Sequence, residues 1–214
     1  MGQDLRITEI FYSLQGETRT TGVPTVFVRL TGCPMRCRYC DTAYAFTGGT
    51  RKSLEAILDE VGTYSPSHVT VTGGEPLAQP AALPLMGALC DRGYVVSVET
   101  GGALPISGID HRVCVVLDIK TPGSGEEGRN DYANLAQLKP ADQVKFVLTD
   151  RSDYEWSRNF IMQYDLHRRC EVLMSPVAGS LPPADLADWI LADRLPVRFQ
   201  VQLHKILWGD ARGR

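Results

Sequence analysis

Short runs rich in β-branched residues alternate along the chain with amphipathic runs, and this alternation is the strongest constraint on the fold. The expected strands cover residues 7–11, 25–31, 68–72, 94–99, 113–117, 143–148, 171–175 and 198–203. The expected helices cover residues 53–63, 81–92, 152–164 and a segment that begins near Pro183. Ser152 and Glu155 have the spacing of a capping box.

Strands that alternate with helices predict an α/β fold with a mainly parallel sheet. A chain of 214 residues is short for a complete eight-fold barrel. We therefore expect a partial, incomplete TIM-like barrel, with an open doubly wound sheet as the alternative.

Polar, Gly-rich or Cys-containing segments follow the carboxyl ends of most expected strands. They are Cys33, Gly73-Gly74-Glu75, Glu99-Thr100, Asp118-Ile119-Lys120, Thr149, Ser175 and His204-Lys205. In parallel α/β architectures, ligands bind at this edge of the sheet. The sequence therefore predicts that these segments share one site.

The composition limits the class of protein and of partner. A net charge of −3 and a pI of about 5.8 argue against a large nucleic-acid-binding face. No apolar run approaches the roughly 20 residues that cross a bilayer, and the first residues lack the apolar stretch of a signal peptide. We therefore expect a cytoplasmic protein that binds neither nucleic acid nor membrane, whose six cysteines form no disulfide framework.

Three of the cysteines, Cys33, Cys37 and Cys40, form the pattern CxxxCxxC. Three thiolates from one tight loop can bind three irons of a [4Fe–4S] cluster and leave the fourth iron open to a small molecule. A structural zinc site normally has four closed ligands, so zinc would need a distant fourth ligand here. The other three cysteines, Cys90, Cys114 and Cys170, stand in apolar surroundings and are expected to pack in the core.

The cysteine pattern, with Tyr39 before its last cysteine, resembles the signature of the radical SAM superfamily. Gly73-Gly74-Glu75-Pro76, which follows an expected strand, resembles the GGEP motif of the same superfamily. The resemblance covers most of the chain and implies a single radical SAM domain over residues 1–214, built as a partial barrel of six strands. It also implies a [4Fe–4S] cluster whose open iron chelates S-adenosylmethionine and cleaves it to a 5′-deoxyadenosyl radical.

The residues expected to bind S-adenosylmethionine share the carboxyl edge of the sheet. Tyr39 would lie near the adenine, and the bare backbone of Gly73 and Gly74 would approach the methionine amino group. The other expected cofactor-binding residues are Asp41, Glu75, Glu99, Asp118, Lys120 and Ser175. Glu99 and Thr100 could equally do no more than end their strand.

Four further segments resemble the 7-carboxy-7-deazaguanine synthases, a family within that superfamily. They are residues 9–17, residues 27–33, Cys40-Asp41-Thr42 and Gln202-Leu203-His204-Lys205. The resemblance implies ring contraction of 6-carboxy-5,6,7,8-tetrahydropterin with loss of ammonia, in the biosynthesis of queuosine and other deazapurines, with Mg²⁺ as a further cofactor. No side-chain general base is predicted, because the cofactor supplies the radical.

A pterin presents a flat edge of hydrogen-bond donors and acceptors together with a carboxylate. The residues expected to bind it are Leu14, Gln15, Gly16, Glu17, Arg29, Thr72 and His204, and Thr42 matches the magnesium-binding threonine. The planar guanidinium of Arg29 suits the carboxylate, and a hydroxyl is a reasonable ligand for Mg²⁺. The ordinary alternatives are a surface charge at Glu17 or Arg29, a structural histidine at His204, and turn-forming roles for Thr42 and residues 14–16.

The chain departs from the family pattern in two places. Many members carry Ser-Pro-Lys where this chain has Asp118-Ile119-Lys120, and many end soon after the His-Lys motif, whereas this chain continues to Arg214. Two rival hypotheses are a glycyl-radical activase, which acts on a large protein partner, and a non-enzymatic iron–sulfur protein. The resemblance implies a homodimer, and a flavodoxin is a plausible reductant.

Overall fold

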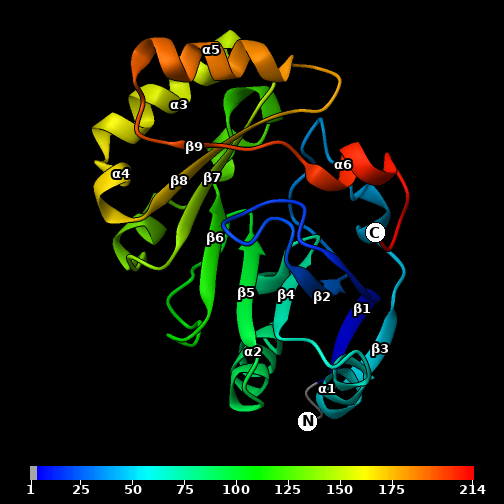
Figure 1. Ribbon diagram of the computed structural model, residues 1–214. Helices are drawn as coiled ribbons and strands as arrows, with labels where there is room; N and C mark the ends of the chain where they lie inside the picture. Colours follow the sequence, from blue (N-terminus) through cyan, green and yellow to red (C-terminus); the bar gives the residue numbers. More distant parts are fainter. Residues whose placement is uncertain (1–3) are drawn as a thin grey trace.

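The computed structural model describes residues 4–214 and contains one nine-stranded sheet (Figure 1). The strands are β1 (Asp4–Leu14), β2 (Pro24–Leu30), β3 (Thr50–Ser53), β4 (His68–Gly73), β5 (Val95–Thr100), β6 (Cys114–Asp118), β7 (Gln143–Leu148), β8 (Glu171–Pro176) and β9 (Arg198–Phe199). Their order is β3-β1-β2-β4-β5-β6-β7-β8-β9. From β2 to β9 in that order every pairing is parallel, whereas β1 is antiparallel to both neighbours.

The sheet is curved and not closed, since its edge strands β3 and β9 do not pair. The mainly parallel α/β sheet and the incomplete barrel are therefore confirmed. Six parallel strands, β2 and β4 to β8, have five to seven residues each, and β9 adds two residues to them.

The first five helices pack on the apolar core on the outer side of the sheet, whereas the last helix lines a cavity on the inner side. They are α1 (Leu54–Thr63), α2 (Ala82–Asp91), α3 (Arg151–Gln163), α4 (Leu166–Arg169), α5 (Pro183–Asp193) and α6 (Leu203–Trp208). Short 3-10 helices are η1 (Ala43–Ala45), η2 (Pro76–Ala78), η3 (Pro122–Ser124), η4 (Glu127–Arg129) and η5 (Tyr132–Gln137). No helix within residues 4–214 is long and apolar enough to span a bilayer.

Alternation along β7 illustrates how the strands separate core from cavity. Val144, Phe146 and Leu148 join the apolar core, whereas Lys145 and Val147 line a cavity on the inner side of the sheet. Because successive side chains of a strand point to opposite faces, one strand can serve both environments.

The first strand differs from the prediction in a way that shapes the site. β1 is longer than residues 7–11 and runs antiparallel to β2, so Leu14 pairs with Pro24, the first residue of β2. The following loop, residues 15–23, therefore starts at the amino ends of the parallel strands. It crosses to the far wing of the sheet, where the Arg19 amide donates to Gln143 Oε1 at 2.7 Å and the Arg19 guanidinium to Glu171 Oε2 at 2.9 Å.

The last predicted strand is wrong beyond Phe199. Residues 200–202 leave the sheet, and α6 begins at Leu203. The side chain of Gln200 accepts from the Thr18 amide at 2.8 Å, and the Leu203 amide donates to Gly16 O at 2.9 Å. Long-range bonds to the loop after β1 thus replace the ladder that local sequence suggested.

The three cysteines outside the CxxxCxxC loop differ in environment. Cys170 is buried in the core, as predicted, and Cys90 is partly buried against it. Cys114 is not a core residue: it lies half-buried at the start of β6, and its thiol donates to Ala141 O at 3.2 Å.

The capping box predicted for α3 is also wrong. The N-cap is Asp150, whose carboxylate accepts from the Asp153 amide at 3.0 Å. Ser152 lies inside the first turn, because Arg151 is already helical.

Replacing the observed cap should therefore destabilise the protein, and replacing the predicted one should not. We expect Asp150→Ala to lower the free energy of unfolding by about 1 kcal/mol, and Ser152→Ala, the matched control, to change it by less than about 0.5 kcal/mol. Urea unfolding followed by circular dichroism measures both. Equal destabilisation by the two variants would contradict the assignment.

Candidate active site

A cavity of about 770 Å³ lies on the inner side of the sheet. The predicted site residues that line it are Leu14, Gln15, Gly16, Glu17, Arg29, Cys33, Cys37, Tyr39, Cys40, Asp41, Thr42, Thr72, Gly73, Gly74, Glu99, Asp118, Lys120 and His204. Two predicted residues, Glu75 and Ser175, do not line it. The structure thus brings almost the whole predicted set together, from segments as distant in sequence as the loop after β1 and α6.

The CxxxCxxC loop is fixed to the segment that follows β6. The Arg38 amide donates to Ser124 O at 3.0 Å, and the Arg36 amide donates to Glu126 Oε1 at 2.8 Å. The guanidinium of Arg36 also lies over the ring of Phe46, 4.3 Å from its centroid. A loop held at several points can present its thiols in one arrangement.

The three thiols suit a cluster better than a single ion. Burial raises the pKa of the Cys33 and Cys37 thiols, and the positive charge of Lys120 opposes that rise. Within residues 4–214, no three His, Cys, Asp or Glu side chains converge closely enough to hold one metal ion. All three cysteines are partly buried and line the same cavity, so their thiols are accessible to a cluster bound there.

The glycines of the GGEP motif are in close contact with the backbone before the cysteine loop. Gly73 has a φ of +149°, and a Cβ there would collide with Leu30 O. A Cβ on Gly74 would collide with Gly32 O. The Gly74 amide donates to Leu30 O at 3.1 Å and the Glu75 amide to Gly32 O at 2.8 Å, so these glycines anchor the cysteine loop to β4.

The carboxylate of Glu75 points into the protein and not into the cavity. It accepts from the Thr100 hydroxyl at 2.8 Å and from the amides of Leu77 and Gly101 at 3.0 and 2.8 Å. Burial raises the pKa of Glu75, against these three hydrogen bonds. The Ser175 hydroxyl is buried too and has no hydrogen-bond partner within residues 4–214.

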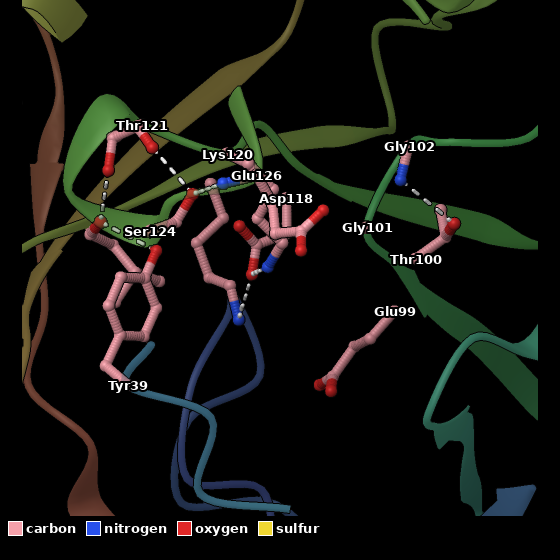
Figure 2. Close-up of polar contacts among 12 residues, drawn as sticks. Tyr39, Glu99, Thr100, Gly101, Gly102, Asp118, Lys120, Thr121, Ser124 and Glu126 are labelled. Carbon is pink, nitrogen blue, oxygen red and sulfur yellow. Dashed lines mark hydrogen bonds and ion pairs between the residues drawn. The ribbon is translucent and has the colours of Figure 1, made fainter. Parts of the chain in front are cut away.

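One wall of the cavity contains Tyr39, Asp118 and Lys120 (Figure 2). Lys120 Nζ lies 3.1 Å from Asp118 Oδ2, while Asp118 Oδ1 is buried and lacks a partner among the described residues. The Tyr39 hydroxyl donates to Val147 O at 3.2 Å, and burial raises the pKa of Tyr39. A buried carboxylate oxygen without a partner, on a residue that lines the cavity, makes Asp118 a candidate for contact with a bound ligand.

The loop after β1 forms the floor of the cavity. Gln15 Nε2 donates to Thr70 Oγ1 at 3.2 Å and to Glu99 Oε1 at 3.3 Å, and the Thr72 hydroxyl donates to Glu99 Oε2 at 3.0 Å. Glu17 is only 8% exposed, so the surface-charge alternative is wrong for its position.

Arg29 is not a solvent-facing charge either. Its Nε donates to Glu9 Oε1 at 2.7 Å, and the hydroxyl of Tyr44 donates to the same oxygen at 2.7 Å. Burial raises the pKa of Tyr44 to about 12. Glu9 thus fixes one edge of the guanidinium, and within the described residues the terminal nitrogens of Arg29 have no hydrogen-bond partner and remain available to a ligand.

Asp41, Thr42 and His204 meet at the mouth of the cavity. The Thr42 hydroxyl donates to Asp41 Oδ1 at 2.7 Å, and His204 Nε2 lies 4.0 Å from Asp41 Oδ2. Burial alone would raise the pKa of Asp41, but the Thr42 hydrogen bond and the charges of Lys205 and His204 lower it. His204 is also in close contact with the loop after β1, because a Cβ on Gly16 would collide with its ring.

Sequence reasoning missed several cavity residues. Lys145 on β7, Tyr44 after the cysteine loop, Gln202 and the tail at residues 209–214 all line the cavity. A lysine at an inward position of an otherwise apolar strand was a signal that could have identified Lys145. No local signal in the tail indicates that it folds back over the site.

Comparisons with known proteins agree with this geometry. The model of the Radical SAM superfamily matches residues 27–113, which include the cysteine loop and β4. A crystal structure of QueE from Escherichia coli superposes with a TM-score of 0.76 at 24% identity, covering 93% of this chain and 94% of that one, and shares its fold.

Two relatives match over almost the whole chain. The 7-carboxy-7-deazaguanine synthase of Chlorobaculum tepidum is 47% identical over 98% of this chain and 97% of its own length. The enzyme of the same name from Koribacter versatilis is 42% identical over 95% of this chain and 97% of its own length. Neither match favours the activase or the non-enzymatic iron–sulfur protein. At these identities and coverages, the chain belongs to the 7-carboxy-7-deazaguanine synthase family of the radical SAM superfamily.

Proposed function

We propose that the protein converts 6-carboxy-5,6,7,8-tetrahydropterin to 7-carboxy-7-deazaguanine with loss of ammonia, for queuosine or other deazapurine biosynthesis. The observation that carries the proposal is one cavity that joins the CxxxCxxC loop to Gln15, Glu17 and Arg29. A volume of about 770 Å³ is within the range of small-molecule sites.

Cys33, Cys37 and Cys40 would hold a [4Fe–4S] cluster, and the adjoining wall would hold S-adenosylmethionine. Together these groups supply the 5′-deoxyadenosyl radical. Tyr39, the backbone of Gly73 and Gly74, and the carboxylates of Glu99 and Asp118 line this wall, where bare backbone and carboxylate oxygens can accept from an amine or from ribose hydroxyls. Glu75 would contribute by fixing the turn after β4 and not by touching the cofactor.

The floor and the opposite wall would hold the substrate. Leu14, Gln15 and Gly16 line the floor, where the carbonyls of Gln15 and Gly16 each accept one hydrogen bond and would have a second lone pair for the pterin edge. Glu17, Thr72 and His204 would offer polar side chains. The two terminal nitrogens of the Arg29 guanidinium would bind the substrate carboxylate, while the bond from Nε to Glu9 keeps the guanidinium in place. The chain's part in catalysis is then to hold the reacting carbon near the radical and to exclude water.

Thr42 would bind Mg²⁺. Its hydroxyl proton is directed to Asp41, which leaves the oxygen lone pairs free for a metal ion. Mg²⁺ would complete its shell with water and substrate oxygens. We also infer, from the family, a homodimer and a low-potential reductant such as flavodoxin.

Anaerobic turnover tests the proposed function directly. Reconstituted protein should contain about four iron and four sulfide ions per chain and should form the deazaguanine from the tetrahydropterin, S-adenosylmethionine and reductant. Cys37→Ala should abolish turnover, and Cys90→Ala, outside the cavity, should retain it. A wild-type protein that binds the full cluster yet makes no deazaguanine would refute the proposal.

Arg29→Lys should reveal the substrate carboxylate. A lysine keeps the charge but loses the planar fork, so we expect kcat/KM for the carboxylated pterin to fall roughly 10- to 100-fold. The affinity of the Arg29→Lys variant for a tetrahydropterin that lacks the carboxylate should change much less. Arg51→Lys, on the exposed strand β3, is the control and should behave like the wild type. Equal losses for both ligands would show that Arg29 does not bind the carboxylate.

Chelation of Mg²⁺ should lower turnover of the wild-type protein. We expect Thr42→Val to raise the Mg²⁺ concentration for half-maximal rate roughly tenfold, which corresponds to about 1.4 kcal/mol. Thr42→Ser retains the hydroxyl and should behave like the wild type. A titration of rate against Mg²⁺ measures all three proteins, and identical curves would rule out Thr42 as a ligand.

A further inference from the structure

Lys145 is a buried cation for which the proposed chemistry has no role so far. It lies in the middle of β7, is only 7% exposed and lines the cavity. Its outward neighbours, Val144 and Phe146, are in the apolar core. A lysine in such a position must be paired to remain charged.

The pairing of Lys145 joins two walls of the cavity. Its Nζ lies 2.5 Å from Glu17 Oε2 on the floor and 3.6 Å from Asp118 Oδ2 on the cofactor side. Burial alone would lower the pKa of Lys145, but the carboxylates of Glu17, Asp118 and Glu99 hold it well above its ordinary value. Lys145 is therefore an ammonium ion with two carboxylate partners.

Both carboxylate oxygens of Glu17 accept hydrogen bonds from protein side chains. Oε2 accepts from Lys145, and Oε1 accepts from Gln202 Nε2 at 2.8 Å. Each carboxylate oxygen has a second lone pair, so both can still accept a hydrogen bond from a ligand N–H. A pterin carries such N–H groups along its flat edge.

A purely structural role explains this arrangement poorly. A buried ion pair often stabilises a protein no more than apolar residues of the same size would. This pair also lies in a cavity wall, beside Gln15 on one side and Lys120 on the other, where a ligand would replace the water.

We propose that Lys145 is a positioning residue: its contact with Oε2 fixes the orientation of the Glu17 carboxylate in the cavity wall, so that Glu17 accepts N–H hydrogen bonds from the pterin ring. The inference rests on the proposed function and assigns to it a residue outside the sequence motifs. Asp118, the second partner of Lys145, links the substrate floor to the cofactor wall.

The charged surroundings of the pair are defined on every side. The nearest titratable groups are Asp118 at the end of β6, Lys120 two residues later, and Glu99 on β5. Farther away lie Asp41, which contacts Gln202, and His204 on α6, which contacts Gly16. Among them, Lys145 is the cation in direct contact with Glu17. Removing Lys145 leaves the buried Glu17 carboxylate without a counter-charge and without the contact that fixes Oε2.

Lys145→Met tests the role, because methionine keeps most of the volume and removes the charge. At neutral pH the KM for the pterin should rise about tenfold or more, with a smaller change in the KM for S-adenosylmethionine. Lys52→Met, whose lysine pairs with Glu60 outside the cavity, should match the wild type.

The double variant Lys145→Met/Glu17→Gln separates positioning from folding. It contains no uncompensated charge at this pair, so it should fold even where the single variant does not. Its pterin KM should be raised as in the single variant, and calorimetric binding of the pterin to the cluster-loaded protein should weaken in parallel.

Two outcomes would overturn the assignment: a folded Lys145→Met protein with an unchanged pterin KM, or a double variant that binds the pterin as the wild type does. The wild-type protein decides the separate question of the reaction. If it does not turn over the pterin, the proposed function fails and this inference fails with it; if it does, only the variants bear on Lys145.

Discussion

The site depends on the contact between the backbone after β4 and the backbone after β2. Gly73 and Gly74 lie so close to Leu30 and Gly32 that neither position has room for a Cβ. Two amide hydrogen bonds join the segments at this point, directly before Cys33. The start of the cysteine loop is therefore attached to the parallel sheet and is not a free surface loop. These contacts with β2 and β4 fix the position from which the thiols are presented.

From sequence alone, the carboxyl-edge rule brought together the residues of the half of the cavity where we propose that the cofactor binds. It succeeded because parallel strands end at the same edge of the sheet. Cys33, Glu99 and Asp118 therefore lie near one another even if the predicted strand bounds are wrong by a residue. The rule could not distinguish side chains that point inward from those that point outward at the edge. Glu75 and Ser175 follow the right strands, yet both are buried away from the cavity.

The half of the cavity proposed for the substrate could be predicted only through family resemblance, because its geometry is set by long-range contacts. Nothing local indicates that β1 runs antiparallel, and that reversal alone brings residues 15–17 beneath the cavity instead of beside its rim. The end of the chain behaves similarly. Residues 200–202 have the composition of a strand, but Gln200 and Leu203 bond to the loop after β1, and the chain turns into α6.

Both halves meet in one line of alternating charge. It runs from Lys120 through Asp118 and Lys145 to Glu17, with contacts of 3.1, 3.6 and 2.5 Å. Each buried charge in this line has a neighbour of opposite sign, which offsets part of the cost of removing it from water. Cofactor and substrate would therefore bind to a wall whose charged side chains hold one another in position. Removing the charge at Lys120 or at Glu17 would change the electrostatic field along the whole line.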